Sequence, residues 1–207
     1  MRRSIGCDLD DVLADFMPAY LRLANTRFGR PAIGSMPVDW EWSNILPDPE
    51  EQKLVWEDVK AIPNFWETLP VMAGVTPRLV YRLDAKHDLY FPTARIAVHG
   101  PDSSARQSAY WVKKQFGIEF PQVFTAYDKK PMAVALKYDY FIDDRPKNCL
   151  DILSVLPNCR VYLKDSSHNQ AFECKGESAV EWQANAIVRI QNFDEFAKIV
   201  LEESCPN

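Results

Sequence analysis

A short apolar run near the N-terminus ends in a group of acids, and this feature constrains the fold more than any other. Residues 4–7 (Ser-Ile-Gly-Cys) lead into Asp8, Asp10 and Asp11, and the apolar residues of the following segment, 15–28, have helical spacing. An apolar strand ends in acids where its carboxyl end faces a polar crevice, as at the ligand sites of open α/β sheets. Alternate strand residues share a face, so Asp8 and Asp10 would point the same way and repel unless a cation or proton lies between them. If Asp10 or Asp11 only capped the next helix, one acid would be explained but not the pair.

Length and charge set the class of protein. A chain of 207 residues suits one domain, or one domain with a sizeable insertion. With 47% apolar and 26% charged residues, the composition is that of a globular protein with a real core. Nucleic-acid binders and proteins of acidic membrane surfaces use basic surfaces, whereas the net charge here is −5. We therefore expect no stable nucleic-acid complex and no membrane association.

The cysteines and the N-terminus indicate the compartment. The five cysteines are scattered and show no paired metal spacing, which is typical of reduced thiols in a cytoplasm. We expect Cys7 and Cys149 to pack as small apolar residues. The start is basic, but Asp8 and Asp10 interrupt the apolar stretch before it reaches signal-peptide length. No run reaches the length of a transmembrane helix, so the sequence predicts a soluble, cytoplasmic protein.

Strand and helix patterns alternate from about residue 76 onward. The apolar patterns predict further strands at 88–93, 122–126, 138–142, 160–163 and 186–190, and helices at 77–86, 102–116, 130–136, 149–156 and 192–203. Gly117 suits the C-terminal cap of the helix before it. Strands that alternate with helices form a parallel sheet covered on both faces. The predicted fold class is α/β, with a Rossmann-like, doubly wound parallel sheet.

The segment between the first strand and this regular part differs in composition. Eight of the fifteen prolines and four of the six tryptophans lie between Met17 and Val80. Dense prolines break long elements, while the aromatic side chains need a place to be buried. We expect a small, mainly helical cap inserted after the first strand, with one helix at 51–62. The expected domains are a core of residues 1–16 and 78–207 and a cap of residues 17–77.

Polar side chains recur at or just after the ends of four predicted strands. They are Asp8 with Asp10, Thr93, Lys129 or Lys130, and Asp143 with Asp144. Taken singly, each has an ordinary structural explanation: a chance pair of acids, the end of a strand, an exposed lysine or a helix cap. Together and in this order they predict one catalytic site at the carboxyl edge of the sheet.

These four signals resemble the motifs of the haloacid dehalogenase superfamily of phosphotransferases. Within it, the chain looks most like the C-type 5′-nucleotidases, which include the cytosolic and mitochondrial deoxyribonucleotidases. The motifs are residues 8–12 (Asp-Leu-Asp-Asp-Val), 90–95 (Tyr-Phe-Pro-Thr-Ala-Arg), 128–129 (Asp-Lys) and 141–146 (Phe-Ile-Asp-Asp-Arg-Pro). The resemblance spans residues 4–156 and implies a haloacid dehalogenase-like core. Lys129 is preferred to Lys130 because the pattern Lys-x-x-Met-Ala-x-x-Leu starts there.

The resemblance implies catalytic roles for the acids. Asp8 would attack phosphorus and form an aspartyl phosphate, and Asp10 would protonate the leaving oxygen and later activate water. So many carboxylates beside a phosphate need a divalent cation, and oxygen ligands favour Mg²⁺. Its expected ligands are the Asp8 side chain, the Asp10 backbone carbonyl and one acid of the doublet, with Asp144 the first choice. Asp143 would then orient a water molecule or Lys129.

The remaining motif residues are implied to bind the substrate. Thr93, with Ala94 beside it, would contact a phosphoryl oxygen, and Lys129 would neutralise charge on the equatorial oxygens. Arg95 and Arg145 are further candidates, either of which could equally be a surface residue. The family's base-contacting places are matched by Phe16, Phe65 and Trp66. Core packing is the rival role for Phe65, and the preferred one for Trp40, Trp42 and Trp56.

The sequence gives little indication of a functional role for the three histidines. We expect His87 and His168 to be exposed on loops, and His99, which follows the second motif, is a minor candidate for substrate contact.

The predicted activity is that of a Mg²⁺-dependent phosphomonoesterase, a 5′-nucleotidase acting on (deoxy)nucleoside 5′-monophosphates. The same motifs would permit a phosphatase for another small phosphate ester or for a nucleic-acid end. A phospho-accepting receiver domain also uses acids, a threonine and a lysine around Mg²⁺. Its accepting aspartate lies on a middle strand, however, and here the strand before the second motif ends in Thr93. The expected partner is a small phosphate ester, and the sequence is compatible with a homodimer.

Overall fold

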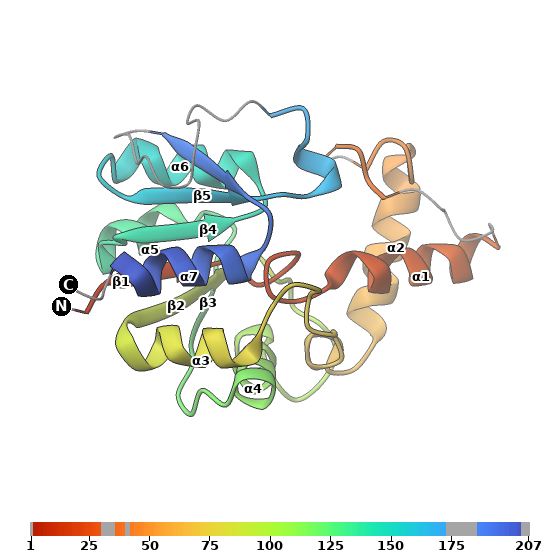
Figure 1. The fold of residues 1–207 in the computed structure, drawn as a ribbon. Coiled ribbons are helices and arrows are strands. Elements are labelled where there is room, and N and C mark those ends of the chain that lie inside the picture. Colours follow the sequence, from red (N-terminus) through yellow and green to blue (C-terminus); the bar gives the residue numbers. More distant parts are fainter. Residues whose placement is uncertain (1, 30–35, 40–41, 173–185, 204–207) are drawn as a thin grey trace.

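The protein, seen here as a computed structural model, is described for residues 2–29, 36–39, 42–172 and 186–203. The expectations for Trp40, Cys174 and Cys205 fall outside these residues. Helices flank a central sheet, and a second group of helices extends from one edge of that sheet (Figure 1).

The sheet has six parallel strands in the order β3-β2-β1-β4-β5-β6. Its strands are β1 (Ser4–Cys7), β2 (Asp88–Thr93), β3 (Gln122–Thr125), β4 (Tyr140–Asp143), β5 (Arg160–Lys164) and β6 (Ile187–Ile190). The central strand β1 pairs with β2 on one side, through Ile5 and Leu89, and with β4 on the other, through Ile5 and Tyr140. The strand order reverses between β1 and β4, and a doubly wound sheet binds its ligands outside the carboxyl ends of the strands at this point. The predicted α/β, doubly wound class is confirmed.

Helices cover both faces of the sheet (Figure 1). They are α3 (Pro77–Lys86), α4 (Ser104–Phe116), α5 (Lys130–Leu136), α6 (Pro146–Val155) and α7 (Phe193–Glu203). α3 packs against α7 and α4, while α5 packs against α6. The buried residues of β4 divide accordingly, with Tyr140 and Ile142 in one apolar cluster and Phe141 in the other. This alternation is what a strand buried on both faces requires.

Several element boundaries differ from the predictions by one to three residues, and two of them lie beside the acidic doublet. β4 begins at Tyr140 and includes Asp143, and α6 begins at Pro146, three residues before the predicted start at Cys149. Proline is well suited to the first position of a helix, because its ring sets φ and its missing N–H would have no intrahelical partner there. The helix therefore starts directly behind the acidic doublet.

Gly6 allows β1 to lie close to its neighbours. A Cβ atom at this position would lie 2.6 Å from Tyr138 Cε2 and 2.9 Å from Phe141 Cδ2. Both contacts are too short for carbon atoms, so any larger residue would push these rings off the strand that carries the acids.

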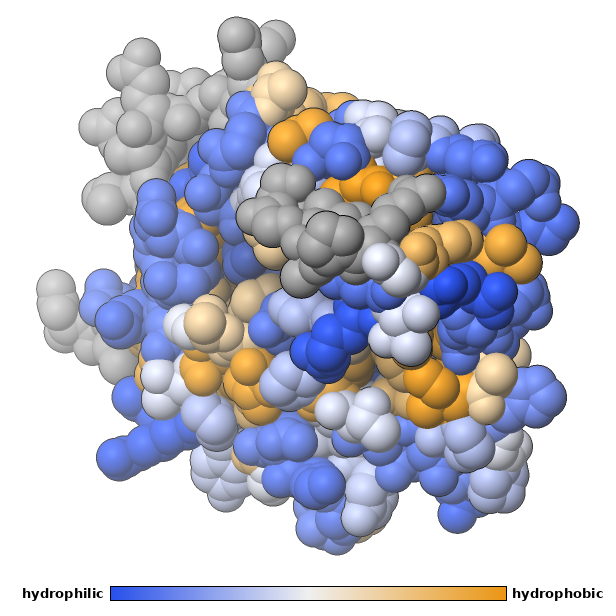
Figure 2. Space-filling model, turned by 90° about the vertical axis from the view of Figure 1, so that its right-hand side faces the viewer, coloured by the Kyte–Doolittle hydropathy of each residue, from blue (hydrophilic) through white to orange (hydrophobic). Residues whose placement is uncertain are grey.

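Beyond the carboxyl edge of the sheet lie α1 (Phe16–Phe28) and α2 (Pro49–Ala61), with the short helix η1 (Phe65–Glu67) (Figure 1). Asp48 caps α2 by accepting a hydrogen bond from the Glu50 backbone N–H at 2.9 Å. An ion pair between Arg27 and Asp58 joins α1 to α2. Seen from this side, hydrophobic residues are interspersed with hydrophilic ones (Figure 2).

None of the helices within the described residues combines the length and apolar character needed to cross a membrane.

Candidate active site

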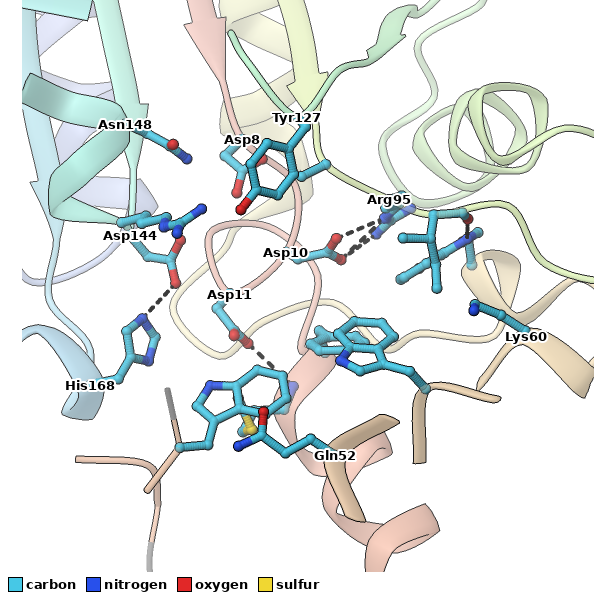
Figure 3. Close-up of a pocket in the computed structure, with 18 of the residues that line it drawn as sticks. Asp8, Asp10, Asp11, Gln52, Lys60, Arg95, Tyr127, Asp144, Asn148 and His168 are labelled. Carbon is cyan, nitrogen blue, oxygen red and sulfur yellow. Dashed lines mark hydrogen bonds and ion pairs between the residues drawn. The ribbon is translucent and has the colours of Figure 1, made fainter. Parts of the chain in front are cut away.

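A cavity of about 620 Å³ lies between the carboxyl edge of the sheet and the helices α1 and α2. Residues of the first, second, third and fourth motifs all contribute to its wall. Figure 3 shows Asp8, Asp10, Arg95 and Asp144 around the cavity. They are Asp8, Asp10, Asp11, Ala94, Arg95, Lys129, Asp144 and Arg145. Aromatic residues of α1, α2 and η1 line the opposite wall. The predicted convergence of the strand ends therefore occurs.

A tight turn carries the acids of the first motif. β1 ends at Cys7, and the carbonyl of Leu9 then accepts hydrogen bonds from the backbone N–H groups of Leu13 and Ala14, at 2.8 and 2.7 Å. Asp11, at the turn, has φ +55°, a left-handed conformation that aspartate tolerates better than most residues. Its Oδ1 accepts a hydrogen bond from the Met17 N–H at 3.3 Å, in the first turn of α1. Asp11 thus accepts a hydrogen bond from the start of α1 and also lines the cavity, together with Asp8 and Asp10.

Lys129 links two of the acids across the sheet. Its Nζ lies 2.6 Å from Asp8 Oδ1 and 2.7 Å from Asp143 Oδ2, and its side chain is 3% exposed. The neighbouring Lys130 is about one-third exposed and lies 3.8 Å from Asp128 and Asp151. The structure therefore brings Lys129, and not Lys130, into the site.

The two acids after β4 have different partners. Asp143 accepts hydrogen bonds from the Arg145 N–H at 2.9 Å and from Asn148 Nδ2 at 3.0 and 3.1 Å, in addition to Lys129. Asp144 instead lies 2.8 Å from His168 Nε2 (Figure 3). Asp143 is thus held in place by donors on all sides, and Asp144 keeps an oxygen turned toward the cavity.

Burial perturbs the titration of these groups. Burial raises the pKa of Asp8 well above its usual range; the charge of Lys129 offsets part of this, and Asp143 adds to it. Burial likewise raises the pKa of Asp143. For Lys129, burial lowers the pKa, but Asp143 and Asp8 more than compensate, so that the net pKa lies above its usual value. The single ammonium group of Lys129 is therefore the counter-charge of two buried carboxylates.

A second charge cluster lies beside the first. Burial, with the charges of Asp144 and Asp10, raises the pKa of Asp11 to about 7. Burial lowers the pKa of His168, yet the hydrogen bond and charge of Asp144 raise it above its usual value overall. The site as a whole holds an excess of buried negative charge.

These residues suit a hard divalent cation. Carboxylate oxygens of Asp8, Asp143 and Asp144 lie within 4.8 Å of one another, and all three residues are buried. A set made only of carboxylates favours Mg²⁺ or Ca²⁺ over zinc or copper. A cation would also offset the burial, and the repulsion from neighbouring acids, that raise the pKa of Asp8. In addition, Thr93 Oγ1 at the end of β2 is buried and lacks a hydrogen-bond partner among the described residues.

Arg95 is buried and bonds to Asp10. Its Nη2 lies 2.8 Å from Asp10 Oδ1, and its Nε lies 3.1 Å from both carboxylate oxygens (Figure 3). A third nitrogen, Nη1, donates to Ser108 Oγ at 3.0 Å. Arg95, predicted as a substrate-binding residue, therefore lines the cavity while directing its donors to protein groups.

The aromatic wall is centred on Phe16. Its ring stacks on Trp56 with centroids 5.6 Å apart and lies 5.9 Å from the ring of Trp66. All three line the cavity, as does Trp42, which is 8% exposed and part of the core as predicted. Phe65 is 3% exposed, packs edge-on against Trp66, and is not among the described residues that line the cavity. Of the aromatic residues predicted to contact the base, Phe16 and Trp66 thus line the cavity, and the half-buried Trp56 lines it beside them.

Two predictions about histidines are wrong. His168 is 9% exposed and bonded to Asp144, and His87 is 1% exposed, with its Nδ1 accepting from the Arg3 N–H at 3.3 Å. His168 follows β5, whose carboxyl end lies at the same edge of the sheet. Its position after a strand could therefore have indicated that it reaches the site. His99 is exposed and lies outside the lining, within the described part of the chain.

The fold and the site define a class of protein. The structure is similar to a HAD-superfamily hydrolase from Ehrlichia chaffeensis, with a TM-score of 0.53, 11% sequence identity and 98% of each chain covered. It is also similar to a predicted haloacid dehalogenase-like hydrolase from Burkholderia xenovorans, with a TM-score of 0.55, 11% identity and 98% of each chain covered. The fold is that of the haloacid dehalogenase superfamily.

Sequence comparison narrows the class to a family. Residues 2–193 match the family described as 5′ nucleotidase, deoxy (pyrimidine), cytosolic type C protein, and the chain belongs to this family. A relative from Staphylococcus epidermidis, named a predicted 5′(3′)-deoxyribonucleotidase, is 30% identical over 182 residues, covering 88% of this chain and 93% of that protein. A Staphylococcus aureus relative of the same name is 28% identical, covering 75% and 81%. The protein is a phosphoric monoester hydrolase of the nucleotidase family.

Proposed function

We propose that this protein hydrolyses (deoxy)nucleoside 5′-monophosphates through an aspartyl-phosphate intermediate on Asp8. The observation that carries the proposal is the buried Asp8–Lys129–Asp143 cluster, of which Asp8 and Lys129 line the floor of a cavity whose other wall is aromatic. The floor is suited to a phosphate, and the aromatic wall to a nucleobase. The names of the sequence relatives agree with such a substrate.

In the first half-reaction, a carboxylate oxygen of Asp8 attacks phosphorus. Oδ1 is held by Lys129 at 2.6 Å, which leaves Oδ2 as the attacking atom. The bond from phosphorus to the ester oxygen breaks, and Asp10 gives that oxygen a proton as the nucleoside leaves. In the second half-reaction, Asp10 takes a proton from water as the water oxygen attacks phosphorus. The bond from phosphorus to Asp8 breaks, which releases inorganic phosphate and regenerates the Asp8 carboxylate.

Other residues stabilise the phosphoryl group as its charge spreads. Lys129 lies against Asp8 and would neutralise an equatorial oxygen, and the unpartnered Thr93 hydroxyl would donate to another. Arg145 lines the cavity beside them. Asp8, Asp144 and the Asp10 backbone carbonyl would hold Mg²⁺, which supplies positive charge to the phosphate when bound. Asp143 would orient Lys129, a role supported by its contacts with Lys129 at 2.7 Å and with Asn148 at 3.0 Å.

The cap selects the leaving group in this proposal. We assign residues 1–16 and 78–207 to the core and residues 17–77 to the cap. Phe16, Trp56 and Trp66 face the floor of the cavity, and their rings offer flat apolar surfaces on which a base can stack.

The test combines a variant that lacks the nucleophile with a comparison of substrates. Asp8→Asn keeps the side-chain volume and removes the attacking oxygen, so turnover should fall by about four orders of magnitude or more. Ribo- and deoxyribonucleotides are then compared with sugar phosphates and with 5′-phosphorylated DNA ends. We expect nucleoside 5′-monophosphates to have the highest kcat/KM.

Two outcomes would contradict the proposal in different ways. Retention of more than about one hundredth of the activity by Asp8→Asn would remove Asp8 as nucleophile. A preference for sugar phosphates or DNA ends of about tenfold, or 1.4 kcal/mol, would leave the phosphatase chemistry intact and reject the nucleotide substrate.

A further inference from the structure

Arg95 lies next to the acid–base residue of the proposed reaction, in the place where the family motif suggests a substrate contact. We propose that Arg95 is a positioning residue, which fixes the Asp10 carboxylate for proton transfer and does not itself bind the phosphate. The inference rests on the proposed function, since it takes Asp10 as the acid–base group.

The geometry of the pair supports this role. Nε and Nη2 of Arg95 approach the two oxygens of Asp10 at 2.8 to 3.1 Å, so the carboxylate is held at both ends. Such a forked contact fixes both the distance and the plane of a carboxylate. The Arg95 side chain is 0% exposed, whereas that of Asp10 is 23% exposed. Although both residues line the cavity, the Arg95 side chain is therefore less accessible than the Asp10 carboxylate.

The guanidinium group is itself held from the other sides. Nη1 donates to Ser108 Oγ at 3.0 Å, and Ser108 donates in turn to the Ser104 carbonyl at 2.6 Å. The rings of Trp66 and Trp111 lie 5.0 and 5.6 Å from Arg95 Cζ. Rotation of the guanidinium toward a phosphate would break these contacts together with the pair to Asp10.

The two indoles are anchored to the backbone. Trp66 Nε1 donates to the Ile96 carbonyl at 2.9 Å, and Trp111 Nε1 donates to the Leu69 carbonyl at 2.7 Å. Trp66 also lines the cavity. One side chain therefore contacts both the space for the leaving nucleoside and the group that fixes Asp10, which places the acid relative to the oxygen that it must protonate.

Leaving groups of different basicity separate a positioning role from a structural one. A nucleoside leaves as a basic alkoxide and needs a proton, whereas p-nitrophenolate leaves with little help. Arg95→Gln should lower kcat/KM for nucleotides by about ten- to hundredfold, the range for a misplaced general acid, and for p-nitrophenyl phosphate by less than about threefold. The inhibition constant of inorganic phosphate should stay the same. Arg106→Gln, at a 77% exposed position on α4, the helix that carries Ser108, is the matched control and should change none of these values.

A double-mutant cycle tests whether Arg95 acts through Asp10. If it does, Arg95→Gln should change nucleotide turnover by less than about twofold in an Asp10→Asn background, because the two effects then share one step. Ser108→Ala removes one support of the guanidinium with little change in volume, and should show the same leaving-group pattern in weaker form if Arg95→Gln does not fold.

Three results overturn the inference: equal losses for both substrates, a further tenfold loss in the Asp10→Asn background, or weaker inhibition by inorganic phosphate. The last would make Arg95 a phosphate ligand. If Asp10→Asn alone keeps full nucleotide turnover, the assignment of Asp10 in the proposed function fails, and the cycle shows this separately.

Discussion

Lys129 Nζ lies 2.6 Å from Asp8 Oδ1, although the two residues are 121 positions apart in the chain. The carboxyl ends of β1 and β3 lie at the same edge of the parallel sheet, and the segment between β3 and α5 brings Lys129 to Asp8. Lys129 reaches Asp143 at 2.7 Å from the same position. A single ammonium group therefore joins the first and fourth motifs, and its loss affects both.

The first prediction is that Lys129→Met lowers kcat by about two to three orders of magnitude, because preorganised charge at the phosphate is lost. Stability should fall as well, by up to about 3–5 kcal/mol, since Asp8 and Asp143 stay buried without their counter-charge. Both acids have raised pKa values in the folded protein, so the folded state binds more protons than the unfolded state and stability falls as pH rises. Without Lys129 the loss should be larger at pH 8 than at pH 5.

Chemical denaturation at both pH values, together with steady-state kinetics, measures these effects. Lys130→Met is the control, and it should leave activity and stability nearly unchanged because Lys130 is partly exposed and only distantly paired. Equal defects in the two variants would argue against Lys129 as the lysine of the site.

Much of the fold and the framework of the site could be predicted from the sequence. Acids at the end of β1, a threonine at the end of β2 and acids at the end of β4 are positioned by strand ends, and parallel strands bring their carboxyl ends to one edge. The alternation of strands with helices therefore predicts that Asp8, Asp143 and Asp144 come together at this edge.

The partners of these acids could not be predicted in the same way. Whether Arg95 turns toward substrate or toward Asp10 depends on the packing of Trp66 and Trp111, which come from separate elements. His168 reaches Asp144 from a short helix after β5, and no periodic pattern marks such a contact. Trp56, expected in the core, lines the cavity, whereas Phe65 does not, because the direction of each ring is set by packing within the cap.

The second prediction concerns the cation. Activity should require Mg²⁺ and be lost in EDTA, because three buried carboxylates lie within 4.8 Å of one another. Asp144→Ala should raise the Mg²⁺ concentration for half-maximal activity more than Asp143→Ala does, since Asp143 is already bound by Lys129 and Asn148. Stabilisation of each variant by Mg²⁺ in thermal unfolding gives a readout independent of turnover. Full activity in excess EDTA would refute the metal requirement, and a larger defect in Asp143→Ala would reverse the choice of ligand.

The third prediction concerns the described cysteines, Cys7, Cys149 and Cys159, which are at most 2% exposed. Burial raises the pKa of Cys159 to about 12 and that of Cys7 well above its usual range, so neither forms the reactive thiolate in the folded protein. Iodoacetamide at pH 8 should leave all three unmodified until denaturant unfolds the chain, as peptide mass spectrometry can show. In the unfolded chain the thiols titrate near pH 8.5. The folded state then retains protons that the unfolded state loses, and stability should decline above this pH.

The last prediction concerns recognition of the base. Trp56 stacks on Phe16 at a centroid distance of 5.6 Å and lines the cavity while remaining only half-buried. Stacking of a base on an aromatic ring contributes about 1–3 kcal/mol, so Trp56→Leu should lower kcat/KM for nucleotides by about five- to hundredfold. Turnover of p-nitrophenyl phosphate should change little, since it lacks the base. Phe65→Leu is the matched control: this ring is 3% exposed and packs behind Trp66, so its truncation should lower the melting temperature and leave the preference for nucleotides intact. A larger loss of that preference in Phe65→Leu than in Trp56→Leu would place the base against η1, and not against α2.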